Sequence, residues 1–276
     1  MAGGRLVPIA TGGVLVAVAA GGLWYLARPA PESAPEVHAP SAAEQQPAGP
    51  DVAAVRAALA AIPCVKGDVV TEPGGEVMLE GTAAAADLVD EAARQAGTVP
   101  GVSSVDNRLT IAPEPGCHAA AQALRLLDGG SGTPPQVTLS KPGGLYLDQD
   151  YLVVEVALPE GASGHVYVDV LTDAGSVYHL LPEPLAQANQ LQAGGRVRIG
   201  VEAAERRDGV RHWQVSPPYG AAYMLATVTE HPLYEGLRPI EEPLDAYMPV
   251  LLAALQDASS GAKAAQVQHL EFRPRS

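Results

Sequence analysis

The sequence predicts an α+β protein with an N-terminal transmembrane helix, an αββαβ domain, and a β-sandwich-like domain that carries a C-terminal helix. Three observations indicate this order: an uncharged apolar run at the N-terminus, a middle region in which helical and strand periodicities alternate, and a longer region of period-two strands. The chain has 276 residues with 25 Pro, 29 Gly and few aromatic side chains (9 Tyr, 2 Trp and 1 Phe). We therefore expect two modest domains rather than one large enzyme core.

The N-terminal run from Leu6 to Ala27 has 22 residues without a charge. At about 1.5 Å per helical residue it reaches roughly the 30 Å of a bilayer's hydrocarbon core. A cleaved signal peptide is the alternative, because Ala17 to Ala19 has the small-x-small form of a cleavage site. The apolar run continues for eight residues beyond it, so we predict a transmembrane anchor over residues 1–28.

Charges near this anchor predict its orientation and the compartment of the remaining chain. Arg5 and the terminal amine lie on one side, whereas Glu32 and Glu36 soon follow Arg28 on the other. This favours a single pass through the inner membrane with the C-terminal domains in the periplasm. Residues 29–50 contain six prolines and predict a semi-extended linker.

The segment 51–117 predicts a small domain in the order helix, strand, strand, helix, strand. Asp51 is a suitable N-cap for the first helix, which Pro63 ends, and Thr82 is a suitable N-cap for the second. The turn Pro73-Gly74-Gly75 separates two strands, and a third follows Pro100-Gly101. The predicted strands are 66–71, 76–81 and 102–111.

The runs VMLEG (77–81) and PGVSSVDNRL (100–109) resemble the BON (bacterial OsmY and nodulation) domain. The resemblance implies an αββαβ module of the bacterial envelope whose usual roles are phospholipid binding or protein contacts. Gly81 would end a strand, and Gly101 would allow the tight turn before the last one. Segment 51–117 has four Lys or Arg against ten Asp or Glu, a net charge of −6, so we expect it to be repelled by anionic headgroups.

The two cysteines, Cys64 and Cys117, bracket this domain. In an exported chain they predict one disulfide, which would stabilise the fold by about 4 kcal/mol through loop closure. Neither lies in a C-x-x-C motif, so a redox-active pair is the weaker interpretation.

A helical connector, 118–136, leads to a β-rich domain over 137–276. The turn 172–175 joins two alternating strands and would place Asp169 and His179 together on a solvent-facing side, as a surface ion pair. Pro243 opens a helix with an apolar face. The predicted strands are 151–158, 165–171, 176–181, 197–201, 212–216, 221–229 and 266–272.

The runs GHVYVD (164–169), GSVYHLLP (175–182) and PPYG (217–220) are similar to a bacterial C-terminal domain family of unknown function. That family also occurs in envelope proteins, in serine/threonine kinases and in caspase-like proteins. The resemblance implies a fold but no reaction.

No motif predicts catalysis, a cofactor or a metal site. The pair Asp169 and His179 could serve a hydrolase, but no G-x-S-x-G accompanies it, and the seven histidines never form H-x-x-x-H. The formal charge of −14 and the lack of a cationic stripe argue against nucleic-acid binding.

Aromatic and proline side chains concentrate in one segment and form the candidate binding site: Trp213, Pro217, Pro218, Tyr219 and Tyr223. The alternative is a strand corner packed by its own aromatic rings. We predict a non-enzymatic, membrane-anchored scaffold that binds envelope or secretion-system proteins, with phospholipid or peptidoglycan as the alternative partner.

Overall fold

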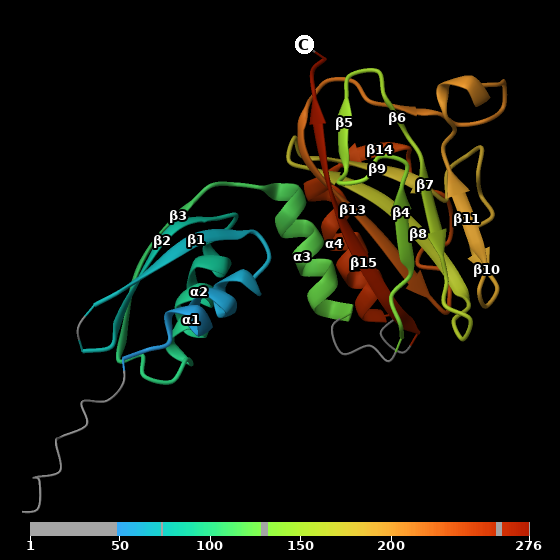
Figure 1. Cartoon of the computed structure of the whole chain (residues 1–276). Helices are drawn as coiled ribbons and strands as arrows, with labels where there is room; N and C mark the ends of the chain where they lie inside the picture. The colour runs from blue at the N-terminus through green and yellow to red at the C-terminus, as the bar shows by residue number, and fades with distance from the viewer. Residues whose placement is uncertain (1–48, 73, 128–131, 258–260, 276) are drawn as a thin grey trace, which may run out of the picture. The chain divides into compact units, whose positions relative to one another are not determined.

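The computed structural model describes residues 49–72, 74–127, 132–257 and 261–275. The predicted anchor over residues 1–28 and nearly all of the predicted linker lie outside the described residues. Within the described ranges, no helix has the length and hydropathy needed to cross a bilayer. The α+β fold class is confirmed, and it is assembled from two domains with separate cores (Figure 1).

The first domain has the predicted element order. Its three strands form one sheet in the order β1-β2-β3, in which β1 and β2 are antiparallel and β2 and β3 are parallel. Both helices bury their apolar sides against this sheet. The elements are α1 (Val52–Ala60), β1 (Val65–Thr71), β2 (Glu76–Ala83), α2 (Ala86–Gly97) and β3 (Ser104–Ile111).

Two helix starts test the capping predictions. Asp51 caps α1 as predicted, since its side chain accepts a hydrogen bond from the Ala53 backbone N–H. The prediction for Thr82 was wrong: it lies in β2, and α2 follows Ala85 without a side-chain cap. A β-branched residue fits a strand well, and here Thr82 pairs with Lys66 and Thr110 in the sheet.

Gly81 also lies inside β2 instead of ending the strand. Its φ is +140°, and a Cβ atom there would collide with the Lys66 carbonyl of the neighbouring strand. The position therefore requires glycine for close strand approach. Gly101, with φ +87°, makes the turn before β3 as predicted.

The second domain is built on a seven-stranded sheet in the order β14-β9-β8-β13-β15-β5, with β10 paired to β8 at the side. Two smaller sheets, β11-β7-β4 and β12-β6, accompany it. The strands of the large sheet are β5 (Leu145–Leu147), β8 (Gly164–Thr172), β9 (Ser176–Leu181), β10 (Gln190–Leu191), β13 (Gly220–Thr229), β14 (Glu241–Pro243) and β15 (Ala262–Arg273). Those of the smaller sheets are β4 (Gln136–Leu139), β6 (Tyr151–Leu152), β7 (Val154–Ala157), β11 (Arg196–Ile199) and β12 (Trp213–Gln214).

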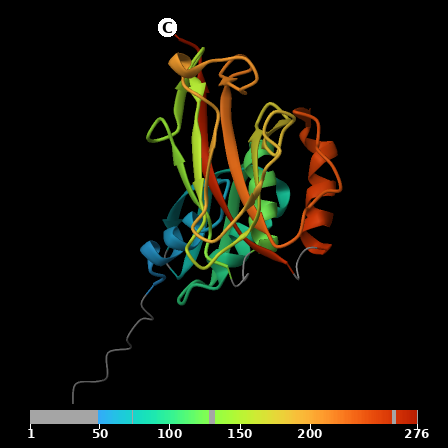
Figure 2. The same cartoon turned by 90° about the vertical axis from the view of Figure 1, so that its right-hand side faces the viewer.

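Each face of the large sheet packs against a different layer (Figure 2). One face joins side chains of the smaller sheets in a sandwich core, with Val168, Met224 and Val156 fully buried. The opposite face is covered by α3 (Pro115–Leu127) and α4 (Leu244–Asp257). The predicted strand pairing about turn 172–175 is confirmed, but the face predicted to meet solvent is a second core.

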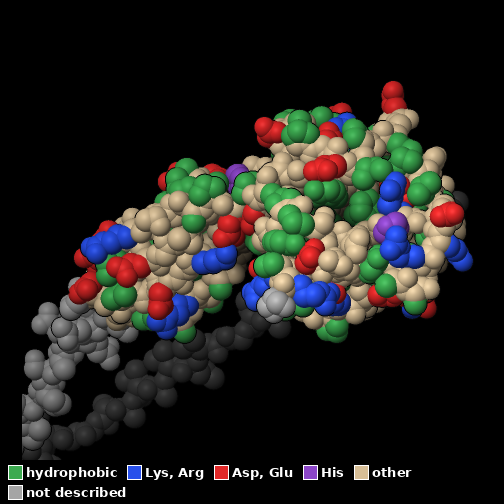
Figure 3. All heavy atoms as spheres, turned by 90° about the horizontal axis from the view of Figure 1, so that it is seen from above, with side chains coloured by type: hydrophobic (Ala, Val, Ile, Leu, Met, Phe, Trp, Pro, Cys, Tyr) green, Lys and Arg blue, Asp and Glu red, His purple; other side chains and the backbone are tan. Residues whose placement is uncertain are grey.

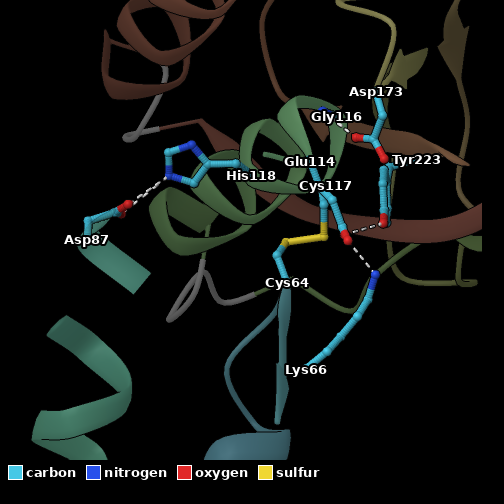
Figure 4. The surroundings of a disulfide bond; sticks show 9 residues. All are labelled: Cys64, Lys66, Asp87, Glu114, Gly116, Cys117, His118, Asp173 and Tyr223. Carbon is cyan, nitrogen blue, oxygen red and sulfur yellow. Dashed lines mark hydrogen bonds and ion pairs between the residues drawn. A yellow bond between two sulfur atoms is a disulfide. The ribbon is translucent and has the colours of Figure 1, made fainter. Parts of the chain in front are cut away.

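Helix α3, predicted as part of a connector, contributes to this second core through small buried side chains such as Ala120 and Ala123. Its first turn is fixed to the β8–β9 turn, because Asp173 accepts a hydrogen bond from the Gly116 N–H at 2.9 Å. The predicted disulfide is present: Cys64 of the first domain bonds to Cys117 of α3 (Figure 4). The bond therefore links the first domain to the core of the second.

Candidate ligand pocket around Trp213

Trp213 lies in the two-residue strand β12, which pairs with β6 so that Trp213 is opposite Leu152. The guanidinium of Arg211 lies over its indole ring, 5.6 Å from the ring centroid. The indole Nε1 is buried and has no hydrogen-bond partner. Buried polar groups are nearly always paired, and this indole N–H is one of three exceptions among the described residues.

A cavity of about 320 Å³ adjoins Trp213. Its walls come from segments far apart in the chain, namely β6, the β8–β9 hairpin, the segment around β12, the residue before β14, and β15. Most of the side chains that line the cavity are aliphatic or aromatic, with a few polar groups between them, as is usual for ligand pockets. The lining comprises Leu152, Val170, Thr172, Tyr178, Leu180, Arg211, His212, Trp213, Gln214, Val215, Ser216, Pro218, Ile240 and Phe272.

The structure brings together only part of the predicted binding site. Trp213 and Pro218 line the cavity, whereas Pro217 is exposed and does not line it, and Tyr219 packs against the sandwich core. Tyr223 lies on the other face of the large sheet, where its ring is 5.3 Å from that of His269. Alternation along β13 explains the separation, because Ala222 and Met224 occupy the sandwich side.

Several wall residues were missed by the sequence prediction. Tyr178 and Phe272 come from β9 and β15, which contact the Trp213 segment only through the tertiary fold. Burial and the neighbouring Glu241 carboxylate raise the pKa of Tyr178 to about 12. Its phenol therefore stays neutral near pH 7 and can both donate and accept a hydrogen bond.

The pair Asp169 and His179 needs a correction. They face each other across the hairpin as predicted, but both are buried, with 3% of each residue exposed. The His179 Nδ1 is 2.7 Å from an Asp169 oxygen, and its Nε2 is 3.0 Å from a Glu242 oxygen. Arg238 binds Glu242 through two hydrogen bonds, and the Tyr247 hydroxyl donates to Asp169 at 2.7 Å. The predicted surface ion pair is thus part of a buried charged network.

This network has equal numbers of positive and negative groups when His179 is protonated. Burial opposes the charged imidazole, but the hydrogen bonds and charges of Asp169 and Glu242 outweigh it and raise the pKa of His179 above its usual value. Burial likewise opposes the Glu242 carboxylate, but Arg238 and His179 outweigh it and lower the pKa of Glu242. The arrangement joins α4 and the edge strand β14 to β8 and β9.

The family comparisons assign both domains. Residues 52–113 match the family model of the BON domain, and residues 149–232 match that of a domain of unknown function, DUF4384. The chain carries a BON domain followed by a DUF4384 domain. Both resemblances predicted from the sequence are confirmed. No curated protein matches the sequence.

The BON domain indicates phospholipid or envelope-related binding. The matched DUF4384 segment contains Trp213, Arg211 and Tyr178, whereas β15 and α4 lie beyond it. On the side shown in Figure 3, hydrophobic side chains lie among acidic and basic ones, and no broad surface of one charge is seen. In the described ranges, no cluster of three or more His, Cys, Asp or Glu side chains could hold a metal ion.

A second cavity of the DUF4384 domain, of about 480 Å³, shares Leu180, Arg211 and Trp213 with the first. Glu183 also lines it and is 1% exposed. One oxygen of Glu183, Oε2, accepts hydrogen bonds from Arg211 at 3.2 and 3.3 Å and from the Leu185 N–H at 3.0 Å. The Arg211 and Trp213 side chains thus form a wall common to both cavities.

Proposed function

We propose that this chain is a single-pass inner-membrane adaptor whose BON and DUF4384 domains bind envelope or secretion-system proteins in the periplasm. The cavity of about 320 Å³ beside Trp213 is the observation that carries the proposal. Trp, Tyr and Arg side chains often dominate protein-binding energy, and Trp213, Tyr178 and Arg211 all line this cavity.

The disulfide supports the periplasmic location. Cys64 and Cys117 are bonded with a Cα–Cα distance of 5.8 Å, within the range usual for disulfides. Such bonds persist in oxidising compartments and are rare in the cytosol. The apolar segment 6–27 would supply both export and anchoring.

The contacts of His179 favour binding over catalysis. Both of its ring nitrogens are occupied by carboxylates, from Asp169 and Glu242, and its ring packs against Tyr247. Among the described contacts of His179, none is with a serine, threonine or cysteine that could act as a nucleophile. This arrangement supports a structural role for the pair and a non-enzymatic protein.

Binding of phospholipid is the second candidate function, because the BON domain favours it. The net charge of −6 over residues 51–117 opposes attraction to anionic headgroups. A lipid interaction of this domain would therefore depend on neutral headgroups or apolar contacts. Peptidoglycan is the other envelope component that the adaptor could bind.

Photocross-linking in cells tests the adaptor function. A photoreactive amino acid at Pro218, on the cavity lining, is expected to give discrete adducts with envelope proteins identified by mass spectrometry. The matched control is the same group at Arg196, an exposed side chain on β11 that does not line the cavity. Trp213→Ala should weaken binding of the purified partner by roughly thirtyfold, a loss of about 2 kcal/mol.

Sedimentation tests the alternative. The full chain in nanodiscs is mixed with phosphatidylglycerol vesicles, with phosphatidylcholine vesicles or with purified sacculi. Vesicles and sacculi sediment on centrifugation and nanodiscs do not, so chain found in the pellet has bound to them. We expect little co-sedimentation with either vesicle. Two results together would favour lipid binding over protein binding as the function. They are sedimentation of the chain with vesicles that does not depend on salt, and equal yields of protein adducts from Pro218 and from Arg196.

A further inference from the structure

A cationic segment borders the cavity of about 320 Å³ beside Trp213. Residues 206–212 have the sequence RRDGVRH, with three arginines and one aspartate, in a chain whose formal net charge is −14. Arg211 and His212 line the cavity itself, and Arg206 is exposed to solvent. The charge at this part of the cavity is therefore opposite in sign to that of the chain as a whole.

Aromatic rings connect these cations to the cavity. The guanidinium of Arg206 lies 5.9 Å from the centroid of the Tyr151 ring and donates a hydrogen bond to its hydroxyl at 3.1 Å. The Tyr151 ring is in turn 6.1 Å from that of His212. Arg211 lies over Trp213 in the same way. Stacking of this kind holds a guanidinium in place while its other N–H groups stay available for a carboxylate.

Neighbouring carboxylates do not cancel this positive charge at the surface. Among the described residues, the ion pairs next to the segment join Arg198 to Glu205 and Arg211 to Glu183. Neither involves Arg206. The Arg211 side chain is 31% exposed, whereas its partner Glu183 is 1% exposed, so that carboxylate is withdrawn from solvent. Exposed charges more than about 8 Å away are largely screened at physiological ionic strength, so the nearby arginines dominate the local potential.

The preference for negative charge is confined to this part of the lining. On another wall, Tyr178 is hydrogen-bonded to the Glu241 carboxylate. Most of the other lining side chains are apolar, among them Leu152, Val170 and Ile240. The cavity thus combines apolar walls with a cationic border on one side.

We propose that the partner segment bound at this cavity is acidic. An apolar side chain of the partner enters the cavity, and Asp or Glu carboxylates close to it in the partner's sequence pair with Arg206 and Arg211. Arginine suits this role because its planar N–H groups match the geometry of a carboxylate. An extended chain advances about 3.3 Å per residue, so these carboxylates lie within a few residues of the apolar side chain. The proposal rests on the adaptor function and adds the chemistry of the partner.

Photocross-linking from Pro218 in cells tests the proposal when it is repeated in the full chain with Arg206→Glu. The yield of protein adducts should fall about tenfold, because a repulsive charge replaces an attractive one. The cross-linked partner peptides should carry carboxylates close to the linked position. The matched control is Arg196→Glu, an exposed position on β11 that does not line the cavity, and that changes the net charge of the chain equally. Its adduct yield should stay within about twofold of wild type.

Binding kinetics of the purified partner separate charge from folding. The association rate at about 0.05 M salt should fall roughly tenfold in Arg206→Glu, and this loss should shrink at about 0.5 M salt, where charges are screened. Arg206→Lys keeps the charge and should stay within about twofold of wild type. A loss in Arg206→Glu that is equal at both salt concentrations would contradict recognition by charge.

Other outcomes identify a different occupant. Adduct yields unchanged by Arg206→Glu, or adducts in neutral or basic segments, would overturn the acidic partner while the adaptor function stands. Adducts to residues 29–50 of this chain would overturn a partner protein as the occupant. Sedimentation with phosphatidylglycerol vesicles that Arg206→Glu abolishes would assign the arginines to anionic lipid instead. The absence of any Pro218 adduct in the wild-type chain would reject the adaptor function itself.

Discussion

Asp169→Asn is expected to lower the free energy of unfolding of the DUF4384 domain by about 3–5 kcal/mol, the usual cost of breaking a buried ion pair from one side. The Asp169 carboxylate accepts from both His179 and Tyr247 at 2.7 Å. An asparagine at this position has no negative charge to pair with the imidazolium, and its single acceptor atom replaces two carboxylate oxygens. Urea denaturation followed by circular dichroism measures the change.

The matched control is Arg196→Gln, which removes an exposed ion pair with Glu155 and should cost less than about 1 kcal/mol. The pH dependence separates the charged network from simple packing. Because the pKa of His179 is raised, its charge stabilises the fold fully below about pH 6.5, and this stabilisation is lost as the pH rises through the folded-state pKa. The difference between wild type and Asp169→Asn should therefore narrow at higher pH. If the free energy of unfolding differed between wild type and Asp169→Asn by the same amount at pH 6 and at pH 9, the charged state of the network would be contradicted.

Replacing both cysteines by serine is expected to cost about 4 kcal/mol, because the bond closes a loop between positions 53 apart in the chain. The loss should appear in the BON domain and in α3, since Cys64 and Cys117 join these two parts. Hydrogen exchange measured by mass spectrometry can locate it.

Besides the short chain segment between β3 and α3, polar contacts next to the bond would still join the two parts. Lys66 pairs with Glu114, and Asp87 lies 3.2 Å from His118 (Figure 4). Such partly exposed pairs contribute little, so we expect them to be insufficient in the double-serine variant. Unchanged exchange in α3 and in β1 would show that the disulfide is dispensable for joining the domains.

Long elements could be predicted from the sequence because their periodicity is a local property. Strand β8 alternates valine with other residues, β13 is a continuous run of mostly apolar residues, and α1 has both a cap and an apolar face. Strands β10 and β14 have two and three residues, which is too short for a periodic signal. Their formation depends on tertiary pairing with β8 and β9.

The buried network shows why the face of a strand could be misread. Asp169 lies between two valines and His179 between Tyr178 and Leu180, a pattern in which polar residues usually face solvent. Their burial depends on Glu242 and Tyr247, which come from β14 and α4 far along the chain. No local pattern connects these residues.

The candidate site was predicted in part for the same reason. Trp213 and Pro218 lie in one short segment, so an aromatic and proline cluster identified them. Glu183 and Phe272 reach their cavities from other elements, and Tyr223 points to the opposite face of β13. The amino-acid composition of a segment therefore does not tell which aromatic residues line a cavity and which face the other side of the sheet.

The most direct test of the adaptor in the envelope is where the full chain resides in cells and whether its two thiols are free. Cells are fractionated after thiols have been blocked with a maleimide, and a second, heavier maleimide is added after reduction. We expect the chain to stay in the membrane fraction through carbonate extraction and to gain two heavy labels only after reduction. A soluble cytosolic chain with both cysteines blocked in the first step would contradict it.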